Sequence, residues 1–476
     1  MKTSIRLLPL LLGSLFACSL AHSADFYVSE NGNDKNDGKS PNTPFLTLQH
    51  ADGALKPGDT VWVMAGTYRS ARSEKDATAL LEIRSSGKPD AWITWRAYPG
   101  ARPELVAQGV WHAILLNASY IKIDGLTLTG NNGNVRQADA EANGEMDLKA
   151  SLAAWKAEGE MNAAMDDATP DQGPGAASAP KKPQAKPRSL PKAYQRISPL
   201  CSANGISADF RGKKEFHHHY VLSNLVVRDF GTGGINMMDT DYYTIENSEV
   251  YNNAWYSPYG GSGISQLRGR DFDQASGYHN IIRNNRVYNN KCLVRLYYLD
   301  LFSDGNGIIL DSLYDYAGAT LVENLSYNNG GAGIHVFRSH KARIDIVNNT
   351  VWRNQQMWRL YDIGAHDATN INILNNIVVA DKYRQVNGKP MAGVRYDHNL
   401  YFGSPQVEAK GPNDRFADPL LALPSTNRKD GDFSLLPGSP AIDSAGRRSG
   451  ASFPPASFLH GAEMKLILAA ALTTTA

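Results

Sequence analysis

A short asparagine-containing segment recurs through the second half of this chain. Its copies occupy residues 245–248, 283–286, 322–325, 347–350 and 374–377, with a looser copy at 221–225. The anchor positions 224, 247, 285, 324, 349 and 376 are 23, 38, 39, 25 and 27 residues apart. A period in the low twenties, built from β-forming residues, is typical of stacked strands in a solenoid. We therefore expect an all-β fold, a right-handed parallel β-helix with an Asn amide at one corner of each coil.

Length and charge narrow the class of protein. The chain has 476 residues and a formal net charge of +1, and a solenoid can hold this length in one continuous core. The near-neutral charge argues against nucleic acid or an anionic membrane as a bulk partner. No stretch after residue 24 is apolar over the roughly 18 residues that a membrane helix needs, so no transmembrane segment is expected. We expect a monomer whose long flank binds a polysaccharide.

The N-terminus has the pattern of a signal peptide. Residues 1–24 contain a basic start, an apolar run and a small-residue cleavage site, which predicts a secreted or periplasmic protein. The alternative is a lipoprotein in which Cys18 is lipidated, although the bulky Phe16 disfavours it. The two remaining cysteines, Cys201 and Cys292, do not make a disulfide framework. We interpret them as separate buried thiols, with pairing as the alternative.

Residues 25–131 are expected to form an N-terminal cap and the first coils. A strand over 25–29 precedes a turn cluster rich in Gly, Asn and Asp. Helical spacing over 47–55 and a strand over 60–64 follow. A short helix at this point suits a cap, because the first coil of a solenoid has an open apolar end.

Residues 132–198 interrupt the strand pattern. Fifteen Ala lie between residues 138 and 193, in an acidic half followed by a basic, Pro-rich half. We interpret this segment as a low-complexity, disordered insertion, with a lid over a groove as the alternative. Coils, a candidate active groove and a closing segment are expected over 199–446. The tail 447–476 has no pattern, and we expect it to be poorly ordered.

The two ends of the predicted rod carry a family resemblance. The opening contains Tyr27-Val28-Ser29, Asn36-Asp37-Gly38, Thr43-Pro44-Phe45, Lys56-Pro57-Gly58-Asp59 and Ala65-Gly66-Thr67-Tyr68, and the ending contains Pro437-Gly438-Ser439-Pro440-Ala441-Ile442-Asp443. These motifs resemble secreted bacterial right-handed β-helix proteins, including the pectate lyases of polysaccharide lyase family nine and uncharacterised relatives. The resemblance implies the pectate lyase-like fold. It also implies a lysine base and an aspartate cluster that binds calcium.

A repeated Gly-Ile pair aligns the strands of successive coils. The pairs begin at Gly234, Gly263, Gly307 and Gly333. If each Ile points inward, the next residue points outward, and coils about 4.8 Å apart bring outward residues into files. The first file contains Asn236, Ser265, Ile309 and His335; the second contains Met238, Leu267, Asp311, Phe337 and His366.

Polar residues of two adjacent coils gather along these files. They are Asp304, Asn306, Asp311, His335 and Arg338. The excursion over 290–302 leads into this cluster and adds Lys291, Arg295, Tyr297, Tyr298 and Asp300. Such excursions usually build the walls of a binding site. Tyr297, Tyr298, Arg295, Asn306 and His366 are the predicted substrate-binding residues.

These residues predict a polysaccharide lyase that cleaves an acidic, uronic acid-containing polymer by β-elimination. That reaction needs a base, a cation beside the carboxylate and a proton source. Lys291 or His335 is the candidate base, and Arg338 or Arg295 the candidate cation. For the calcium site that the resemblance implies, the sequence offers Asp300, Asp304 and Asp311.

Alternatives remain at this stage. Asp304 and Asp311 would also serve a glycoside hydrolase as paired carboxylates, and a non-catalytic polysaccharide-binding or envelope solenoid is a third hypothesis. Asp304 also suits a turn before Gly305, and Arg338 a structural ion pair with Asp311. The run His217–His219 is not read as a metal site, because consecutive strand residues point in opposite directions.

Overall fold

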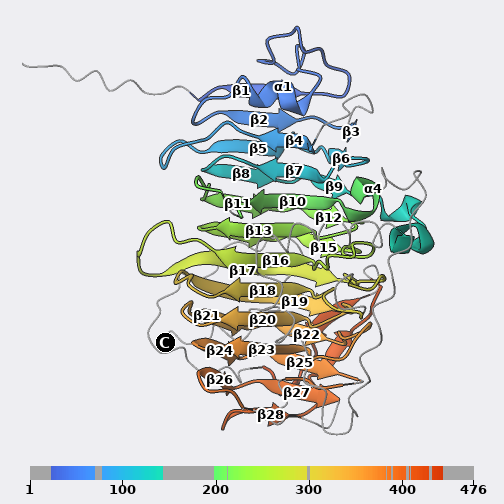
Figure 1. Cartoon of the computed structure of the whole chain (residues 1–476), viewed down its shortest axis with the longest axis vertical. Helices are drawn as coiled ribbons and strands as arrows, with labels where there is room; N and C mark the ends of the chain where they lie inside the picture. The colour runs from blue at the N-terminus through green and yellow to red at the C-terminus, as the bar shows by residue number, and fades with distance from the viewer. Residues whose placement is uncertain are drawn as a thin grey trace, which may run out of the picture.

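The computed structural model describes residues 23–69, 78–142, 198–211, 213–296, 301–381, 383–386, 390–403, 407, 409–427 and 431–442. Within these ranges the chain winds into a rod of stacked coils, with its first coil at one end and its last at the other (Figure 1). Sequence positions expected to form the signal peptide, most of the insertion and the tail lie outside the described residues. In the described part of the chain, no helix is long and apolar enough to cross a membrane.

Each coil contributes strands to three faces of the rod, and the strands within each face are parallel. One face is an eight-stranded sheet made of β4 (Ala79–Ile83), β7 (His112–Leu116), β10 (Asn204–Asp209), β13 (Ile235–Thr240), β16 (Ile264–Gly269), β18 (Ile308–Leu313), β20 (Ile334–Ser339) and β23 (Ile363–Ala368). The other two faces join into one sheet, because β17 (Tyr278–Tyr288) and β19 (Ala319–Tyr327) run across the corner between them.

The second face follows the eight-stranded sheet along each coil. Besides the first parts of β17 and β19 it contains β1 (Asp25–Val28), β2 (Thr60–Val63), β5 (Ile93–Ala97), β8 (Ile121–Asp124), β11 (Tyr220–Ser223), β14 (Tyr243–Glu246), β21 (Ile344–Val347), β24 (Ile371–Leu374) and β26 (Val394–Asp397). The third face adds β3 (Thr67–Arg69), β6 (Glu104–Val106), β9 (Thr127–Thr129), β12 (Val226–Arg228), β15 (Glu249–Tyr251), β22 (Thr350–Trp352), β25 (Ile377–Ala380), β27 (Leu400–Gly403) and β28 (Arg415–Phe416).

The core of the rod is a stack of aliphatic side chains. Aligned Ile residues lie side by side on neighbouring strands of the eight-stranded sheet, from Ile206 on β10 to Ile363 on β23. These Ile side chains are fully buried. Burying one such side chain stabilises a fold by about 1.5–3 kcal/mol, so this column fixes the register of the whole face.

A column of Asn side chains, which we call the corner ladder, joins the coils between the second and third faces. It contains Asn285, Asn324, Asn349, Asn376 and Asn399, all buried. The Asn324 Oδ1 atom accepts from the backbone N and the Nδ2 atom of Asn285 at 3.0 and 2.9 Å. The Asn324 Nδ2 atom donates to Ile282 O at 2.8 Å. Each amide thus satisfies backbone groups of the preceding coil, as the sequence predicted.

Two members of the predicted column, Asn224 and Asn247, are wrong, and they lie beside each other in neighbouring coils. Asn247 lies one residue away from the ladder, and Ser248 takes the ladder position, with its backbone N donating to Asn285 Oδ1 at 3.0 Å. Asn247 instead adopts a φ of +53°, like Asn284 at +54° in the next coil. Asn tolerates this left-handed backbone better than most residues, which explains its recurrence there.

A second ladder lies five residues further along each coil. It contains Asn253, Asn290, Asn329 and Asn354, and neighbouring members are joined from backbone N to Oδ1 at 3.0–3.1 Å. The repeated Tyr-Asn-Asn at 251–253, 288–290 and 327–329 is its sequence signature. Lys291 directly follows this ladder, so the ladder fixes where the excursion over 290–302 begins.

The two terminal segments of the rod pack in different places. Helix α1 (Leu48–Asp52) packs at the first coil, with the Thr47 hydroxyl accepting from His50 N at its N-terminus. Near the C-terminus, β29 (Leu421–Leu423) and β30 (Asp432–Leu435) form an antiparallel hairpin that lies against the third face. Phe433 of this hairpin packs against aromatic side chains of the third face.

The region of the expected insertion is partly described. Residues 132–142 and helix α4 (Ser198–Ser202) belong to the packed rod, together with the 3₁₀ turn η1 (Asn132–Asn134). Asn132 Nδ2 donates to Phe230 O at 3.0 Å and to Asn252 O at 2.7 Å. The packed chain thus continues about ten residues beyond the expected boundary at 132. Cys201 and Cys292 are both buried and form no disulfide with each other, which confirms that they do not pair.

Candidate active site

The outward side chains of the eight-stranded sheet form the two predicted files. The strand register confirms both, and extends the first to Gly364 beside His335. Asp311 on β18 lies beside Phe337 on β20, and Ile309 beside His335. Within the two files, Asp311 and His335 are therefore the outward polar side chains of these two coils that can take part in a reaction.

Arg338 closes this group at the end of β20. Its φ of +54° places it in the left-handed region. Its guanidinium carbon lies 4.8 Å from the centre of the Phe337 ring, and its Nη1 donates to the Tyr314 hydroxyl at 3.1 Å. The cation is therefore held over the second file, close enough to Asp311 to act on its pKa.

Asp304 reaches the same place from the turn before β18. A side chain added at Gly260 would lie 2.4 Å from Asp304 Oδ2, so only Gly at position 260 lets the carboxyl pack there. Trp358 Nε1 donates to Asp304 O at 2.8 Å and holds the turn from the following coil. Among the described residues, no hydrogen bond reaches the carboxyl oxygens of Asp304.

Asp304 and Asp311, the carboxyl pair, have unusual acid strengths. Burial raises the pKa of Asp304 to about 7, and the negative charge of Asp311 adds to the effect. Burial also raises the pKa of Asp311, to about 6, while the hydrogen bond from Ser312 and the charge of Arg338 act in the opposite direction. Burial thus makes both groups weaker acids than ordinary aspartates, so that the pair can hold a proton near neutral pH.

His335, in the file next to that of Asp311, is buried without hydrogen bonds to its ring nitrogens among the described residues. Burial lowers its pKa to about 3, and nearby His366 contributes, so the imidazole is neutral at physiological pH. The ring meets that of Tyr361 edge-on at 5.4 Å. A neutral imidazole here can donate or accept a hydrogen bond from a bound molecule.

The other predicted site residues divide into three groups. Lys291 lies at the same corner as Asp304, because a side chain added at Gly305 would come within 2.9 Å of its Cα. His366 stacks on Phe337 with ring centres 5.5 Å apart, and the Arg295 guanidinium lies over Phe302 at 5.5 Å. The predicted residues Tyr297, Tyr298 and Asp300 lie outside the described residues.

Asn306 has a structural environment. Its side chain is 1% exposed, its Oδ1 accepts from Ala332 N at 2.8 Å, and its Nδ2 donates to Ser262 Oγ at 3.3 Å. The amide therefore joins three coils in the way that the ladders do. These bonds occupy the groups with which Asn306 was predicted to bind substrate.

The predicted calcium site is described only in part, because Asp300 lies outside the described residues. Calcium takes about six to eight oxygen ligands, and the part of the predicted aspartate cluster that is described supplies only Asp304 and Asp311. No group of three or more His, Cys, Asp or Glu side chains suited to a metal is found in the described chain. In the run of three histidines, the His219 ring stacks between Tyr120 and Tyr242 at 4.7 and 4.5 Å.

Sequence reasoning missed several residues at this site. Tyr361, Trp358 and Tyr314 all come from connections between strands. An aromatic residue shortly before or after an aligned strand is a signal that could have identified them. Their contacts depend on how each connection folds back, which strand periodicity does not encode.

Comparison with known families agrees with this geometry. A family model described as the Pel9A-like right-handed β-helix region matches residues 26–158, and one described as the right-handed β-helix region matches residues 200–405. The rod is a right-handed β-helix. The crystal structure of pectate lyase Pel9A is similar to it with a TM-score of 0.52 and 13% identity, covering 92% of this chain and 95% of that one. At this identity the likeness shows the fold alone.

Two further matches are more limited. A solved structure named glycoside hydrolase has a TM-score of 0.48 and 9% identity, covering 83% of this chain and 96% of that chain. The uncharacterized protein YwoF of Bacillus subtilis (strain 168) is 34% identical over 92 residues. That alignment spans 19% of this chain and 18% of YwoF. The right-handed β-helix is thus a fold that this chain has in common with pectate lyase Pel9A.

Proposed function

We propose that this β-helix protein is a glycan-cleaving enzyme that hydrolyses a glycosidic bond with its carboxyl pair. The observation that carries the proposal is a pair of carboxyls, Asp304 and Asp311, placed together beside Arg338 and raised by burial to a pKa of about 7 and about 6, so that the pair shares a proton near neutral pH. Glycoside hydrolysis needs one carboxyl that is protonated and one that is ionised at the same pH. The hydrolase hypothesis, the second choice from sequence, therefore becomes the first.

The roles follow from the environments. Asp304, the weaker acid, donates its proton to the glycosidic oxygen as the carbon–oxygen bond breaks. Asp311, ionised beside Arg338, supplies negative charge at the anomeric carbon, either by taking a proton from the attacking water or by attacking directly. His335, neutral and unpartnered among the described residues, is placed to hydrogen bond a sugar hydroxyl. The anomeric form of the first product, followed by NMR, distinguishes the two routes for Asp311.

β-Elimination on a uronic acid polymer is the second candidate function. Arg338 favours it, because a fixed guanidinium near the groove could hold a substrate carboxylate. Lys291 and His335 are the candidate bases in that reaction. The neutral state of His335 permits it to accept a proton, although a pKa of about 3 makes it a weak base.

One assay separates these functions. The purified protein is incubated with neutral and uronic acid polysaccharides, and both reducing ends and the ultraviolet absorbance of unsaturated uronates are followed. Hydrolysis predicts reducing ends without that absorbance, and loss of both in Asp304→Asn and Asp311→Asn. Asp90→Asn, which changes an exposed carboxylate in an early coil, is the matched control. An unsaturated product would replace hydrolysis with elimination, and binding without cleavage would indicate a non-catalytic solenoid.

The place of action is part of the proposal. The basic start, apolar run and small-residue site of residues 1–24 support export to the periplasm or beyond. An exported enzyme meets extracellular glycans directly. Cell fractionation, with labelling of Cys18 by a fatty acid analogue, tests secretion against lipid anchoring.

A further inference from the structure

A hollow of about 340 Å³ opens beside the carboxyl pair, where β13, β16 and β18 end. It is lined by Asp239, Arg268, Gly269, Arg270, Asp271, Ser312, Tyr314, Asp315 and Tyr316. The Ser312 hydroxyl donates to Asp311 Oδ1 at 2.8 Å, and the Tyr314 hydroxyl accepts from Arg338 at 3.1 Å. The hollow thus borders Asp311 and Arg338 of the candidate active site.

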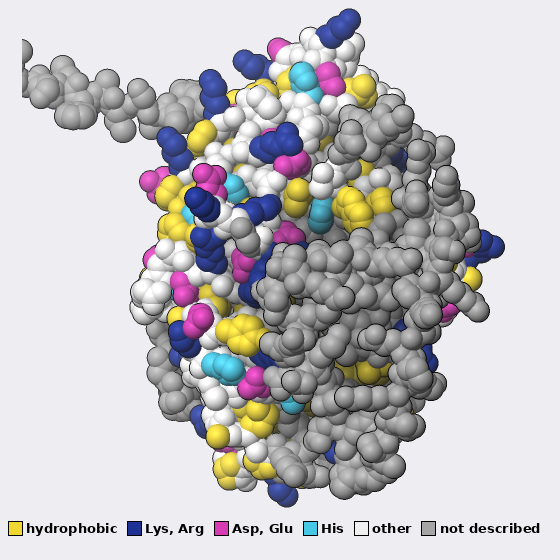
Figure 2. Space-filling model, viewed as in Figure 1, with side chains coloured by type: hydrophobic (Ala, Val, Ile, Leu, Met, Phe, Trp, Pro, Cys, Tyr) yellow, Lys and Arg dark blue, Asp and Glu magenta, His cyan; other side chains and the backbone are white. Residues whose placement is uncertain are grey.

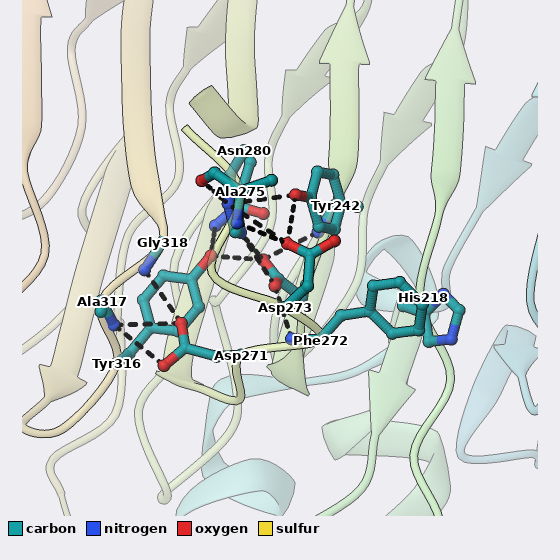
Figure 3. A network of polar contacts seen from close by, with 12 residues as sticks. His218, Tyr242, Asp271, Phe272, Asp273, Ala275, Asn280, Tyr316, Ala317 and Gly318 are labelled. Atoms are coloured by element: carbon teal, nitrogen blue, oxygen red, sulfur yellow. Dashed lines mark hydrogen bonds and ion pairs between the residues drawn. The ribbon is translucent and has the colours of Figure 1, made fainter. Parts of the chain in front are cut away.

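Two connecting loops that form its walls are bonded to each other. The Asp271 carboxylate accepts from the backbone N–H groups of Ala317 and Gly318, at 3.1 and 3.0 Å to Oδ1 (Figure 3). On the other side of Tyr316, its hydroxyl donates to Asp241 Oδ1 at 2.5 Å and accepts from Asn280 Nδ2 at 2.6 Å. Charge-assisted bonds of this kind are the stronger hydrogen bonds in proteins, and here they fix the shape of the hollow.

A buried ion pair supports these loops from below. The Asp241 side chain is fully buried, accepts from Phe272 N at 2.8 Å and lies 3.0 Å from His279 Nδ1. Burial by itself would lower the pKa of His279, but bonds to Ala275 O and Asp241 and the charge of Asp241 raise it. Because these bonds already order the loops, binding a ligand loses little additional conformational entropy.

The charges that line the hollow are compensated. Arg268 Nη2 lies 3.3 Å from Asp239 Oδ2, and Asp315 Oδ1 lies 2.7 Å from the ammonium of Lys341. Arg270 donates to the backbone carbonyls of residues 213 and 214 at 2.9 and 2.7 Å. Acidic and basic side chains are likewise interspersed on the face of the rod seen in Figure 2. An anionic ligand would gain from the arginines but be opposed by three carboxylates.

A polyhydroxyl ring suits this lining better than an ion does. Sugar hydroxyls donate to carboxylates and accept from guanidinium groups at the same time. The Tyr314 ring is 42% exposed and offers an aromatic surface against which a sugar ring can pack. We infer that the hollow is a subsite for an uncharged sugar unit of the glycan, next to the bond cleaved by the carboxyl pair. This inference rests on the proposed function and makes the substrate a glycan with a neutral unit at this position.

Binding to a catalytically silenced protein tests the inference. The Asp304→Asn protein is titrated by calorimetry with neutral xylo-, gluco-, galacto- and manno-oligosaccharides and with oligogalacturonates of equal length. Tyr314→Ala in that background should weaken the tightest neutral probe roughly 3–10-fold, the range expected for one lost ring contact. Phe402→Ala, which removes an exposed aromatic of β27 in the last coils, should leave the affinity unchanged.

Turnover by the unsilenced protein separates this inference from the proposed function. Arg268→Gln should raise KM for the cleaved glycan with little change in kcat, whereas Tyr314→Ala also removes a partner of Arg338 and should raise KM whatever its effect on kcat. The inference is overturned if both leave KM and affinity unchanged, if oligogalacturonates bind more tightly than every neutral probe, or if no probe binds at millimolar concentration. Cleavage that survives Asp304→Asn would instead overturn the proposed roles of the carboxyl pair and leave the KM result interpretable.

Discussion

Replacing Asp304 with Asn should stabilise the protein at neutral and alkaline pH while it abolishes cleavage. The folded-state pKa of Asp304 is raised from 3.8 to about 7. Because the folded state binds the proton more tightly than the unfolded state, this group favours folding below the unfolded pKa. Its stabilising effect is lost as pH rises towards the folded pKa. Asn has nearly the shape of the neutral acid and never ionises.

The magnitude follows from the pKa shift. One pKa unit corresponds to about 1.4 kcal/mol, so a shift of roughly three units gives a ceiling of about 4 kcal/mol. Because the carboxyl keeps part of its exposure to water, we expect Asp304→Asn to gain about 1–3 kcal/mol in free energy of unfolding near pH 8. Near pH 5, about one unit above the unfolded pKa of 3.8, the gain should be roughly a third of the gain at pH 8.

Urea unfolding, monitored by far-ultraviolet circular dichroism at both pH values, measures this difference. Comparing variant with wild type at each pH cancels contributions from other titrating groups, His279 included. Asp90→Asn controls for removal of an exposed carboxylate and should show no pH-dependent change. An equal effect of Asp304→Asn at the two pH values would falsify the view that Asp304 is held against its ionisation.

Other expected outcomes concern the rate of cleavage, the stability that the corner ladder provides and the loop over residues 270–277. The kcat/KM for cleavage should be greatest between about pH 6 and 7, the two pKa values of the carboxyl pair. Arg338→Ala removes the positive charge that lowers the pKa of Asp311, so the acidic limb of this pH profile should move to higher pH. An unchanged acidic limb argues against the contact between Arg338 and Asp311. Asn324→Ala should lower the free energy of unfolding by about 2–4 kcal/mol in urea titrations, because buried backbone groups lose partners. Asn247→Gly, outside the ladder and at positive φ, should cost less than about 1 kcal/mol. Protease cleavage within residues 270–277 should increase as pH rises from 6.5 through the raised pKa of His279, since the bond to Asp241 favours the imidazolium; a flat profile contradicts this.

The alignment of the files shows how far sequence patterns reach. Asp311, His335 and Arg338 were placed on one wall because strand side chains alternate and the Gly-Ile pair repeats in every coil. The misplacement of Asn247 has a local cause. β14 and β15 pair with β17 in one unbroken register, which sets Asn247 beside Asn284 and Ser248 beside Asn285. Asn occurs at both of these corner positions, so the motif alone does not tell which of the two belongs to the ladder.

The aromatic residues on the connections around the site could not be predicted from strand periodicity. Tyr361 and Tyr314 come from connections of different lengths, and their positions depend on contacts with other coils. The choice between hydrolysis and elimination also changed with the structure. It turned on burial of the carboxyl pair, which arises from Gly260, Trp358 and other residues distant in sequence.

The sequence by itself determined the rod, most of its ladder and the file of outward residues, because each follows from a repeat that neighbouring residues encode. Only the tertiary structure decided how far burial raises the pKa values of the carboxyl pair, which aromatic rings lie near it and where a hollow opens beside Asp311. Those properties depend on the loss of water around a group and on the packing of loops from several coils. Both are set by chain segments far apart in sequence, so no local pattern contains them.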